Sequence, residues 1–299
     1  MGTLKLKAQT NRETSMKRVD FHMHTTCSDG SYTPTELLNY CKEKGLDVVA
    51  VTDHDTVESH SEAKKAAEQN GIELIPGIEI SCEFKPGTLH ILGYFIDPEN
   101  KEMLSNLENI QRARKERNPG IIKKLNDMGI EITMEEVAAV SGGGQIGRPH
   151  FARVLIEKGY AKDNEEVFKK FLGKGGSAYL DKRRVSAEQG IGFIRQAGGL
   201  PVVAHPMTLN IKDRAELIRV FGEWKESGLY GIEAHTSAHT LEEQDFYKGI
   251  GEELGLAITG GSDFHGENKP DIDLGWMGGD NVHMTYDIVE QMKQELNIS

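Results

Sequence analysis

The stretch Val19-Asp-Phe-His-Met-His-Thr-Thr-Cys-Ser-Asp-Gly30 is the part of the sequence around which the rest can be interpreted. It begins as a short strand in which His22 and His24 are two residues apart. Because strand side chains alternate between two faces, both imidazoles leave the same face. Asp29 follows on a turn marked by serine and glycine. Imidazole and carboxylate together suit a divalent cation, but a lone His-x-His is only suggestive, so the case depends on ligands at other strand ends.

The composition limits the classes of partner. The chain has 299 residues, which suits one large domain or a large domain with a smaller insert. Its net charge of -12, from 35 basic and 47 acidic residues, argues against a broad nucleic-acid surface and an anionic membrane partner. An anionic substrate stays open, because bound metal ions reverse the local charge. The three cysteines have no CxxC spacing, which predicts a cytoplasmic protein.

Strands and helices alternate in the first hundred residues. Thr33-Pro34-Thr35-Glu36 has the residues of a capped helix start, and that helix is expected to run to Lys44. The β-branched run at 47–52 predicts a buried strand. A further helix at 59–70 and strands at 72–81 and 88–94 follow, the first of these strands being broken by Pro76-Gly77. This order is typical of a parallel α/β fold.

The sequence changes character between the two halves of this pattern. Helical segments with little β-branched content are expected at 102–117, 121–128, 134–140, 149–158 and 164–171. The α/β pattern then returns, with strands at 200–204, 229–233 and 256–260 and helices at 187–197, 216–226, 241–254 and 288–296. We therefore predict a main fold of residues 18–98 and 181–299 and an all-helical insertion of residues 99–180. Residues 1–17, polar and basic without an apolar core, are expected to be a disordered lead-in or a cloning remnant, and no apolar run approaches a membrane span.

Candidate metal ligands recur at successive strand ends. In a closed parallel barrel these ends converge on one mouth, so residues distant in sequence meet there. Each candidate alone has an ordinary explanation, such as a solvated turn residue or a core histidine. That these explanations hold for all of them at once, with every candidate at a strand end, is improbable. Nine ligands are too many for one ion and suffice for two or three. They are His22, His24, Asp29, His54, Glu79, His90, His205, Asp263 and His265.

The motifs around these residues resemble, in order and over both halves of the main fold, those of the PHP (polymerase and histidinol phosphatase) family. They are Asp20-Phe-His22-Met-His24, Thr52-Asp-His54-Asp55, Gly77-Ile-Glu79, His90, Ala204-His205-Pro206 and Ser262-Asp263-Phe-His265. The resemblance implies a distorted (β/α)7 barrel with a trinuclear site. One ion would take His22, His24, Glu79 and Asp263, a second would share Glu79 and take His90 and His205, and a third would take Asp29, His54 and His265.

The insertion narrows the subgroup. Gly147-Arg148-Pro149-His150-Phe151-Ala152-Arg153 resembles a motif of the small PHP phosphoesterases, which include 3',5'-nucleoside bisphosphate phosphatases and a 5'-3' exoribonuclease of short RNA. Arg114 and Arg117 lie three residues apart on the preceding helix and therefore share a face. Guanidinium groups suit bidentate phosphate recognition. We expect substrate contact from Arg114, Arg117, Arg148, His150 and, by resemblance to a subgroup position, His239.

The resulting hypothesis is a metal-dependent phosphoesterase that hydrolyses a phosphomonoester of a nucleoside bisphosphate or monophosphate. Two or three ions (Mn, Zn or Fe) would supply a metal-bound hydroxide near neutral pH, and Asp53 and Asp55 could orient ligand histidines. A 5'-3' exoribonuclease on short RNA, a histidinol phosphatase and a non-catalytic metal-binding module are the alternatives. The complete ligand set argues against the last, and the net charge favours small substrates over long RNA.

Overall fold

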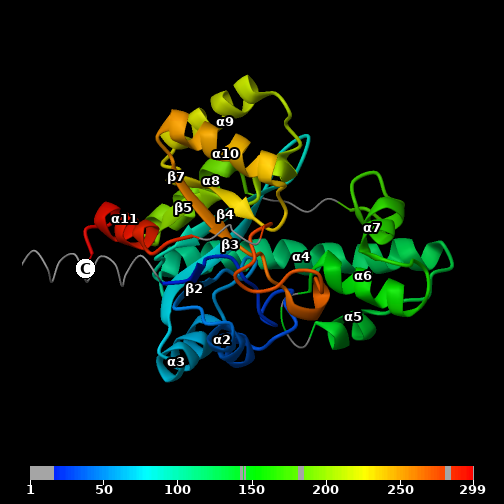
Figure 1. Ribbon diagram of the computed structural model, residues 1–299. Coiled ribbons are helices and arrows are strands. Elements are labelled where there is room, and N and C mark those ends of the chain that lie inside the picture. The colour runs from blue at the N-terminus through cyan, green and yellow to red at the C-terminus, as the bar shows by residue number, and fades with distance from the viewer. Residues whose placement is uncertain (1–16, 142–143, 145, 181–184, 280–283, 299) are drawn as a thin grey trace, which may run out of the picture.

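Seven strands form one curved sheet in this computed structural model, which describes residues 17–141, 144, 146–180, 185–279 and 284–298. Apart from residue 17, the expected lead-in lies outside the described residues. The strands follow one another around the sheet in chain order, and helices surround them (Figure 1). They are β1 (Val19–Asp20), β2 (Val48–Val51), β3 (Glu73–Cys82), β4 (Leu89–Tyr94), β5 (Leu200–Val203), β6 (Gly231–Thr236) and β7 (Ala257–Gly261).

The sheet closes into a barrel between its first and last strands. Met23 and Phe264, just beyond β1 and β7, form a parallel bridge. The N–H of His24 donates to the carbonyl of Phe264 over 2.9 Å, and the N–H of Asp263 donates to the carbonyl of His22 over 2.9 Å. The distorted barrel predicted from the sequence is confirmed. Its closure also fixes the first and last metal motifs side by side through backbone hydrogen bonds.

Strand β4 departs from the expected parallel pattern. It is antiparallel to both β3 and β5, whereas the other neighbouring pairs are parallel. The short connection between β3 and β4 contains no helix, and a connection of this length can only turn the chain back on itself. His90 therefore reaches the barrel mouth from the beginning of its strand and not from its end. The expectation that every ligand follows a parallel strand was wrong at this position.

Strand β3 is continuous through Pro76-Gly77, where the sequence predicted a break. Pro76 pairs in register with Val51 of β2. Gly77 allows this close approach, because a Cβ atom at that position would lie 2.7 Å from the carbonyl oxygen of Val51. Because the strand is unbroken, its pairing with β2 fixes the position of Glu79 along the barrel axis.

Amphipathic helices cover the barrel. The capping box predicted at Thr33 is confirmed, since its hydroxyl accepts from the N–H of Glu36 and the Glu36 carboxylate accepts from the N–H of Thr33. Fully buried Ile78, Ile80 and Ile91 of the sheet pack against the helices, and each contributes about 1.5–3 kcal/mol by burial. The helices are α2 (Pro34–Glu43), α3 (His60–Asn70), α8 (Ala187–Gln196), α9 (Arg214–Glu226), α10 (Leu241–Leu254) and α11 (Asp287–Glu295).

A helical segment extends from one side of the barrel between β4 and β5 (Figure 1). Its first helix, α4 (Lys101–Asp127), is one continuous helix with Pro119 inside it, so the two expected segments are joined. After α5 (Met134–Val140), α6 (Arg148–Glu157) and α7 (Asn164–Val167), the chain continues as a π-helical turn at Phe168–Leu172, which is wider than an α-helix. These helices share a hydrophobic cluster that includes Ile121, Phe151 and Leu172. Among the described residues, no helix is long and apolar enough to cross a membrane.

Candidate metal centre

All nine predicted ligands lie at one end of the barrel. The loop after β1 carries His22, His24 and Asp29, and the loop after β7 carries Asp263 and His265. The remaining four are His54 in the loop after β2, Glu79 within β3, His90 at the start of β4 and His205 two residues after β5. Their ligand atoms form four overlapping groups, each within 4.8 Å: His24, Asp29, His54 and His265; His22, His24 and Asp263; His22, Glu79 and His205; and His54, Glu79 and His90.

One set of atoms has the dimensions of a tetrahedral metal site. The Nε2 atoms of His22 and His24 each lie 3.2–3.4 Å from Glu79 Oε2 and Asp263 Oδ1. Metal–ligand bonds of about 2.0–2.1 Å in tetrahedral geometry would separate the ligands by about 3.3 Å. These four residues are the set that the family resemblance assigns to one ion.

The other oxygen of Glu79 faces a second pair of histidines. Glu79 Oε1 lies 2.9 Å from His90 Nδ1 and 3.0 Å from His205 Nε2. Glu79 is fully buried on β3, so its two oxygens point to fixed and different places. A carboxylate in this position can bridge two ions.

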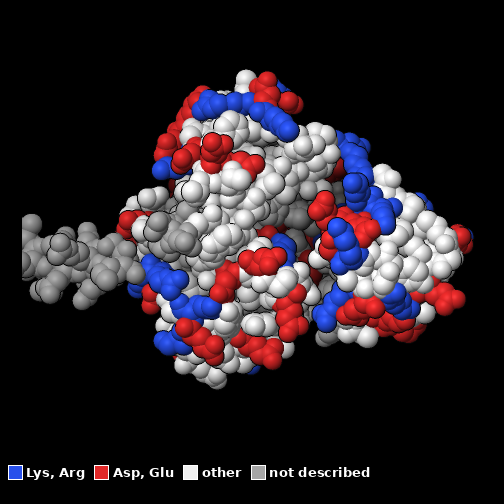
Figure 2. All heavy atoms as spheres, turned by 45° about the vertical axis from the view of Figure 1, so that its right-hand side comes forward, with Lys and Arg blue, Asp and Glu red and all other residues white. Residues whose placement is uncertain are grey.

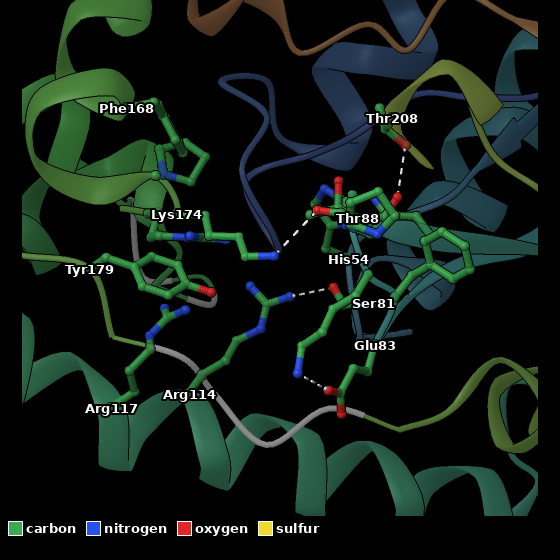
Figure 3. Close-up of a pocket in the computed structure, with 18 of the residues that line it drawn as sticks. His54, Ser81, Glu83, Thr88, Arg114, Arg117, Phe168, Lys174, Tyr179 and Thr208 are labelled. Atoms are coloured by element: carbon green, nitrogen blue, oxygen red, sulfur yellow. Dashed lines mark hydrogen bonds and ion pairs between the residues drawn. The ribbon is translucent and has the colours of Figure 1, made fainter. Parts of the chain in front are cut away.

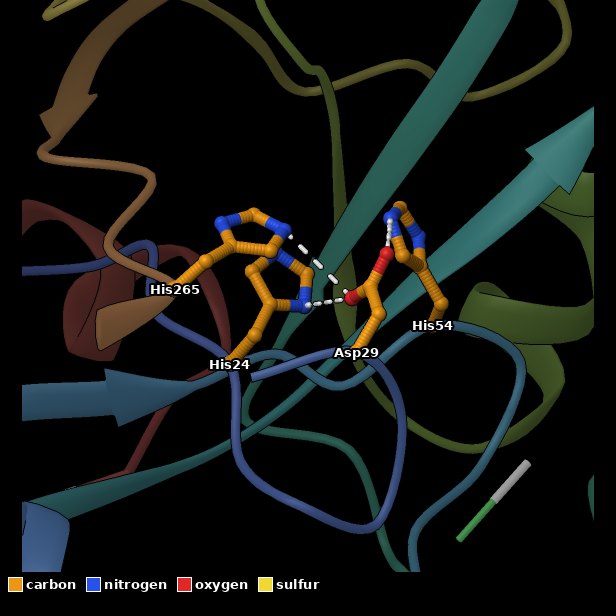
Figure 4. A group of neighbouring side chains, drawn as sticks. All are labelled: His24, Asp29, His54 and His265. Carbon is orange, nitrogen blue, oxygen red and sulfur yellow. Dashed lines mark ion pairs between the residues drawn. The ribbon is translucent and has the colours of Figure 1, made fainter. Parts of the chain in front are cut away.

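Asp29 organises the third group (Figure 4). Its Oδ1 lies 3.4 Å from His265 Nε2 and 3.7 Å from His24 Nδ1, and its Oδ2 lies 3.7 Å from His54 Nε2. His54 also approaches Glu79 Oε2 through its Nδ1, at 2.9 Å. In both His24 and His54, one ring nitrogen therefore faces Asp29 and the other faces Glu79. The expected assignment placed each of these histidines with one ion only.

Several of these atoms are buried without a hydrogen bond in the described part of the chain. They are the Nε2 atoms of His22 and His24, the Nδ1 atoms of His54 and His90, and Glu79 Oε2. A buried polar atom that lacks a partner costs about 1–3 kcal/mol. Here the nitrogens and oxygens converge at close range without hydrogen-bond geometry, as ligands around a cation do. The residues present therefore fit divalent metal ions.

The charges of the site also suit cations. Burial alone would lower the pKa of His24, but the carboxylates around the ring, Asp263, Glu79 and Asp29, raise it to about 9. Burial would raise the pKa of Glu79, yet His54, His90 and His22 hold it well below its usual value. The carboxylates thus stay ionised and stabilise whatever positive charge lies between them, whether protons or metal ions.

Asp53 and Asp55, which we expected to orient ligand histidines, form hydrogen bonds and an ion pair with residues outside the ligand set. Asp53 accepts hydrogen bonds from the backbone and hydroxyl of Thr25, at 2.8 and 2.7 Å, and from the Ser28 hydroxyl. Asp55 accepts from the N–H of Ser81 over 2.7 Å and forms an ion pair with Arg114. Asp53 therefore holds the loop that presents Asp29, and Asp55 ties the helical segment to the barrel.

A cavity of about 460 Å³ adjoins the metal ligands and separates them from the helical segment (Figures 2 and 3). Asp29, His54 and His90 line its barrel side. Its other side carries the three predicted arginines together with Lys174, Phe168 and Tyr179. The guanidinium of Arg148 donates to the carbonyl of Leu172 over 3.0 Å and lies over the rings of Phe168 and Tyr179, 6.0 and 5.6 Å from their centroids.

The two histidines expected to touch substrate are not among the residues that line this cavity. His150 is buried, and its Nδ1 accepts from the N–H of Gly147 over 3.0 Å, which stabilises the start of α6. His239 is also buried: its Nδ1 donates to the carbonyl of Ala234 over 2.9 Å, and its ring stacks on Tyr247. Both have structural partners within their own parts of the fold.

Sequence reasoning missed three charged residues of the site. Asp20 is fully buried and accepts from the N–H groups of Ser262 and Gly275, at 2.9 and 2.8 Å. Glu233 is fully buried against His22. Lys269 forms an ion pair of 2.6 Å with Asp263 Oδ2, the oxygen that faces away from His22 and His24. Asp20 stood in the first of the quoted motifs, whereas Glu233 and Lys269 were only charged residues in an apolar strand or near a ligand motif. None of these signals reveals the partner of the charge.

The PHP domain family matches residues 20–174, and the chain belongs to this family. It is 32% identical to a 3',5'-nucleoside bisphosphate phosphatase of Chromobacterium violaceum, over 87% of this chain and 91% of that protein. It is 34% identical to a 5'-3' exoribonuclease of Haemophilus influenzae, over 83% of this chain and 90% of that protein. Among solved structures, a Bifidobacterium adolescentis protein described as a metal-dependent phosphoesterase superposes with a TM-score of 0.82 at 28% identity, covering 93% of this chain and 96% of that one. The protein is accordingly a phosphoesterase of the PHP family.

Proposed function

We propose that this protein is a metal-dependent phosphatase of small nucleotides, with a preference for a nucleotide that carries a second phosphate. One observation carries the proposal: a single cavity has the metal ligands on one side and Arg114, Arg117 and Arg148 on the other. A substrate with two separated anionic groups would engage both sides, whereas a monophosphate would engage only one.

The distribution of charge supports an anionic substrate in an acidic protein. The chain carries a net charge of -12, yet three arginines and two lysines, Lys85 and Lys174, line the cavity. In a recessed site, cationic groups act through a lower effective dielectric than at an open surface, so their attraction for phosphate is stronger. The acidic remainder of the surface would disfavour long nucleic acids.

We assign the metal centre the nine ligands described above, in two or three sites for Mn, Zn or Fe. When bound, these ions would lower the pKa of a coordinated water and neutralise charge on the phosphate. The chain's own part is to fix the geometry: Glu79 offers one oxygen to each of two groups, and Asp29 connects His54 and His265. The backbone bonds that close the barrel keep both ligand loops in place.

The arginines would bind the part of the substrate that does not react. Arg114 donates to Ser81 Oγ over 2.9 Å and pairs with Asp55, so its guanidinium is held directly beside the metal ligands. Arg148 is held within the helical segment by Phe168, Tyr179 and the Leu172 carbonyl. We place the reacting phosphate near Arg114 and the second phosphate or the ribose near Arg148.

Residues 99–180 would then act as a cap over the barrel mouth. Their helices supply one side of the cavity, and Lys174 reaches the carbonyl of Pro86 in the β3–β4 connection over 3.4 Å (Figure 3). A cytoplasmic location is consistent with the three free cysteines.

Hydrolysis of short RNA from its 5' end is the second candidate. The relative from Haemophilus influenzae carries that name, and the terminal phosphate and the following phosphodiester of an oligonucleotide offer the same two anionic groups. Histidinol phosphate has one phosphate and a cationic amine, which the arginine side of the cavity would repel.

Phosphate release from a substrate panel tests these readings. The panel contains a nucleoside 3',5'-bisphosphate, a nucleoside monophosphate, histidinol phosphate and a 5'-phosphorylated trinucleotide, each with Mn²⁺ and with Zn²⁺. Arg148→Ala is compared with Arg153→Ala, because Arg153 lies on the same helix and pairs with Glu157 at the surface. We expect preference for the bisphosphate, lost in Arg148→Ala and kept in Arg153→Ala. Stepwise release of nucleotides from the trinucleotide would favour the exoribonuclease, and inactivity of the metal-loaded protein on every substrate would overturn the proposal.

A further inference from the structure

Glu233 lies beneath the metal ligands on β6, with no exposure to solvent. Its Oε1 is 2.8 Å from His22 Nδ1, and its Oε2 accepts the backbone N–H of His205 over 2.8 Å. One carboxylate therefore holds two candidate ligands that are 183 residues apart in the sequence and belong to different parts of the barrel. The rings of these two histidines stack, with centroids 5.6 Å apart.

The contact with His22 determines which ring nitrogen can bind a metal. An ionised carboxylate only accepts hydrogen bonds, so Nδ1 of His22 must carry the proton. The lone pair is then on Nε2, which faces Glu79 Oε2 at 3.3 Å and Asp263 Oδ1 at 3.4 Å. Glu233 thus selects the tautomer of His22 whose free nitrogen points into the ligand group.

The contact with His205 holds a strained backbone. His205 has φ of 25°, a conformation that residues other than glycine rarely adopt, just after β5. The hydrogen bond from its N–H to Glu233 helps to keep the ring turned towards Glu79, whose Oε1 is 3.0 Å from His205 Nε2. The strand itself is adapted to this task, because the register of β6 with β7 shifts between Glu233 and His235, and such a bulge redirects a side chain.

We propose that Glu233 is a positioning residue that fixes His22 and His205 together as metal ligands, and so couples the two metal groups that share Glu79. A buried carboxylate is costly unless it is paired, and the ion-pair partner of Glu233 in the described part of the chain is His22. Metal ions bound on the far side of that imidazole would offset the free-energy cost of burying this charge. The inference rests on the proposed metal dependence and is independent of the substrate.

The substitution Glu233→Gln separates this role from that of a merely space-filling side chain. Glutamine has nearly the same shape but only one acceptor oxygen. If that oxygen accepts from the N–H of His205, the amide NH₂ faces His22 and forces the proton onto Nε2, where a metal would bind. In the opposite orientation, the amide meets the N–H of His205 donor to donor.

The test is calorimetric titration of the metal-stripped full-length protein with Mn²⁺. Thr259→Val is the matched control, because Thr259 lies opposite Glu233 on β7 and is equally buried but belongs to none of the ligand groups. We expect Glu233→Gln to weaken Mn²⁺ binding about 10–100-fold, with unchanged far-UV circular dichroism of the metal-free protein, and Thr259→Val to bind as the wild type does. The visible spectrum of the Co²⁺-loaded protein should change in Glu233→Gln only.

Wild-type Mn²⁺ affinity and an unchanged Co²⁺ spectrum in Glu233→Gln would overturn the proposal, and so would equal weakening in Thr259→Val. If Glu233→Gln does not fold, Glu233→Asp carries the test: it keeps the charge but is one methylene shorter, so it cannot reach both partners, and wild-type affinity in that variant would overturn the proposal. All of these measurements of metal binding are made without any substrate. A protein that binds metal normally yet hydrolyses nothing in the panel would contradict the proposed substrate class and leave the role of Glu233 intact.

Discussion

The two sides of the cavity are built in different ways. The metal side takes its nine proposed ligands from one end of the barrel, where short side chains project from the strands or from the loops that follow them. The arginine side takes long side chains from α4 and α6, whose guanidinium groups contact Asp55 and Ser81 in one case and Phe168, Tyr179 and the Leu172 carbonyl in another. A barrel edge fixes atoms to within a fraction of an ångström, whereas long side chains can adapt to their ligand. We therefore assign chemistry to the first side and substrate selection to the second.

The largest expected effect is the loss of the metal side. In His22→Ala or Asp263→Ala, turnover should fall by roughly 10³-fold or more, because several kcal/mol of charge stabilisation and the activated water disappear. The barrel should remain folded, which circular dichroism will check. A chelator should reduce wild-type turnover equally, and added Mn²⁺ should restore it in the wild type only. Normal turnover in either variant would remove the basis for assigning chemistry to this side.

Arg114 connects the two sides, and its removal should affect both activity and stability. Arg114→Ala removes the ion pair between Arg114 and the fully buried carboxylate of Asp55, and breaking a buried pair costs about 3–5 kcal/mol. We also expect kcat/KM to fall about tenfold or more through the loss of a charge-assisted phosphate contact. Urea unfolding and steady-state kinetics measure the two effects. Arg112→Ala, on the same helix with an exposed contact to Asn109, should stay within about 0.5 kcal/mol of the wild type. If Arg114→Ala and Arg112→Ala have the same stability and the same kcat/KM, the ion pair of Arg114 with Asp55 does not connect the two sides of the cavity.

A smaller effect is expected from the aromatic residues that hold Arg148. Tyr179→Leu removes one ring under the guanidinium, and a cation–π contact is worth about 0.5–1 kcal/mol at a partly exposed site. KM for the bisphosphate should rise about two- to fivefold with little change in kcat, because the contact positions the substrate without acting on the reacting phosphate. Phe171→Leu, in the same region but outside the cavity lining, serves as the control. A fall in kcat without a change in KM would place Tyr179 on the chemical side instead.

The smallest effect lies at the opposite end of the barrel. Burial would raise the pKa of Glu73 at the start of β3, but Lys293 and Tyr286 lower it below its usual value. The ionised carboxylate therefore contributes stability above pH 4.5, which is lost as the pH falls through the lower folded-state pKa. Glu73→Gln should cost at most about 1 kcal/mol at pH 7, and the difference should vanish in acid. Urea unfolding at pH 7 and pH 3 measures it, and a cost that persists in acid would exclude the charge as its cause. Turnover should be unchanged.

Much of the metal side could be predicted from the sequence because its physical rules are local. Strand side chains alternate, turns follow strands, and ligand types recur at each strand end, so the nine residues were recognisable one motif at a time. His90 was found for a reason that the structure corrects, since β4 runs antiparallel and presents this residue at its start. The arginine side was recognisable only as a pattern of residue types, and two of its expected members, His150 and His239, lie outside the cavity lining.

The sequence by itself identified the nine residues that we propose as metal ligands and the order in which the barrel supplies them. Only the tertiary structure decided which atom faces which. Glu79 sends its two oxygens to different histidines, and Asp55 pairs with an arginine from the helical segment. Glu233, which stands in an apolar strand without any motif, meets His22 and His205. The physical reason is that periodicity places a side chain on a face, whereas its partner depends on the closure, register and strand direction of the whole barrel.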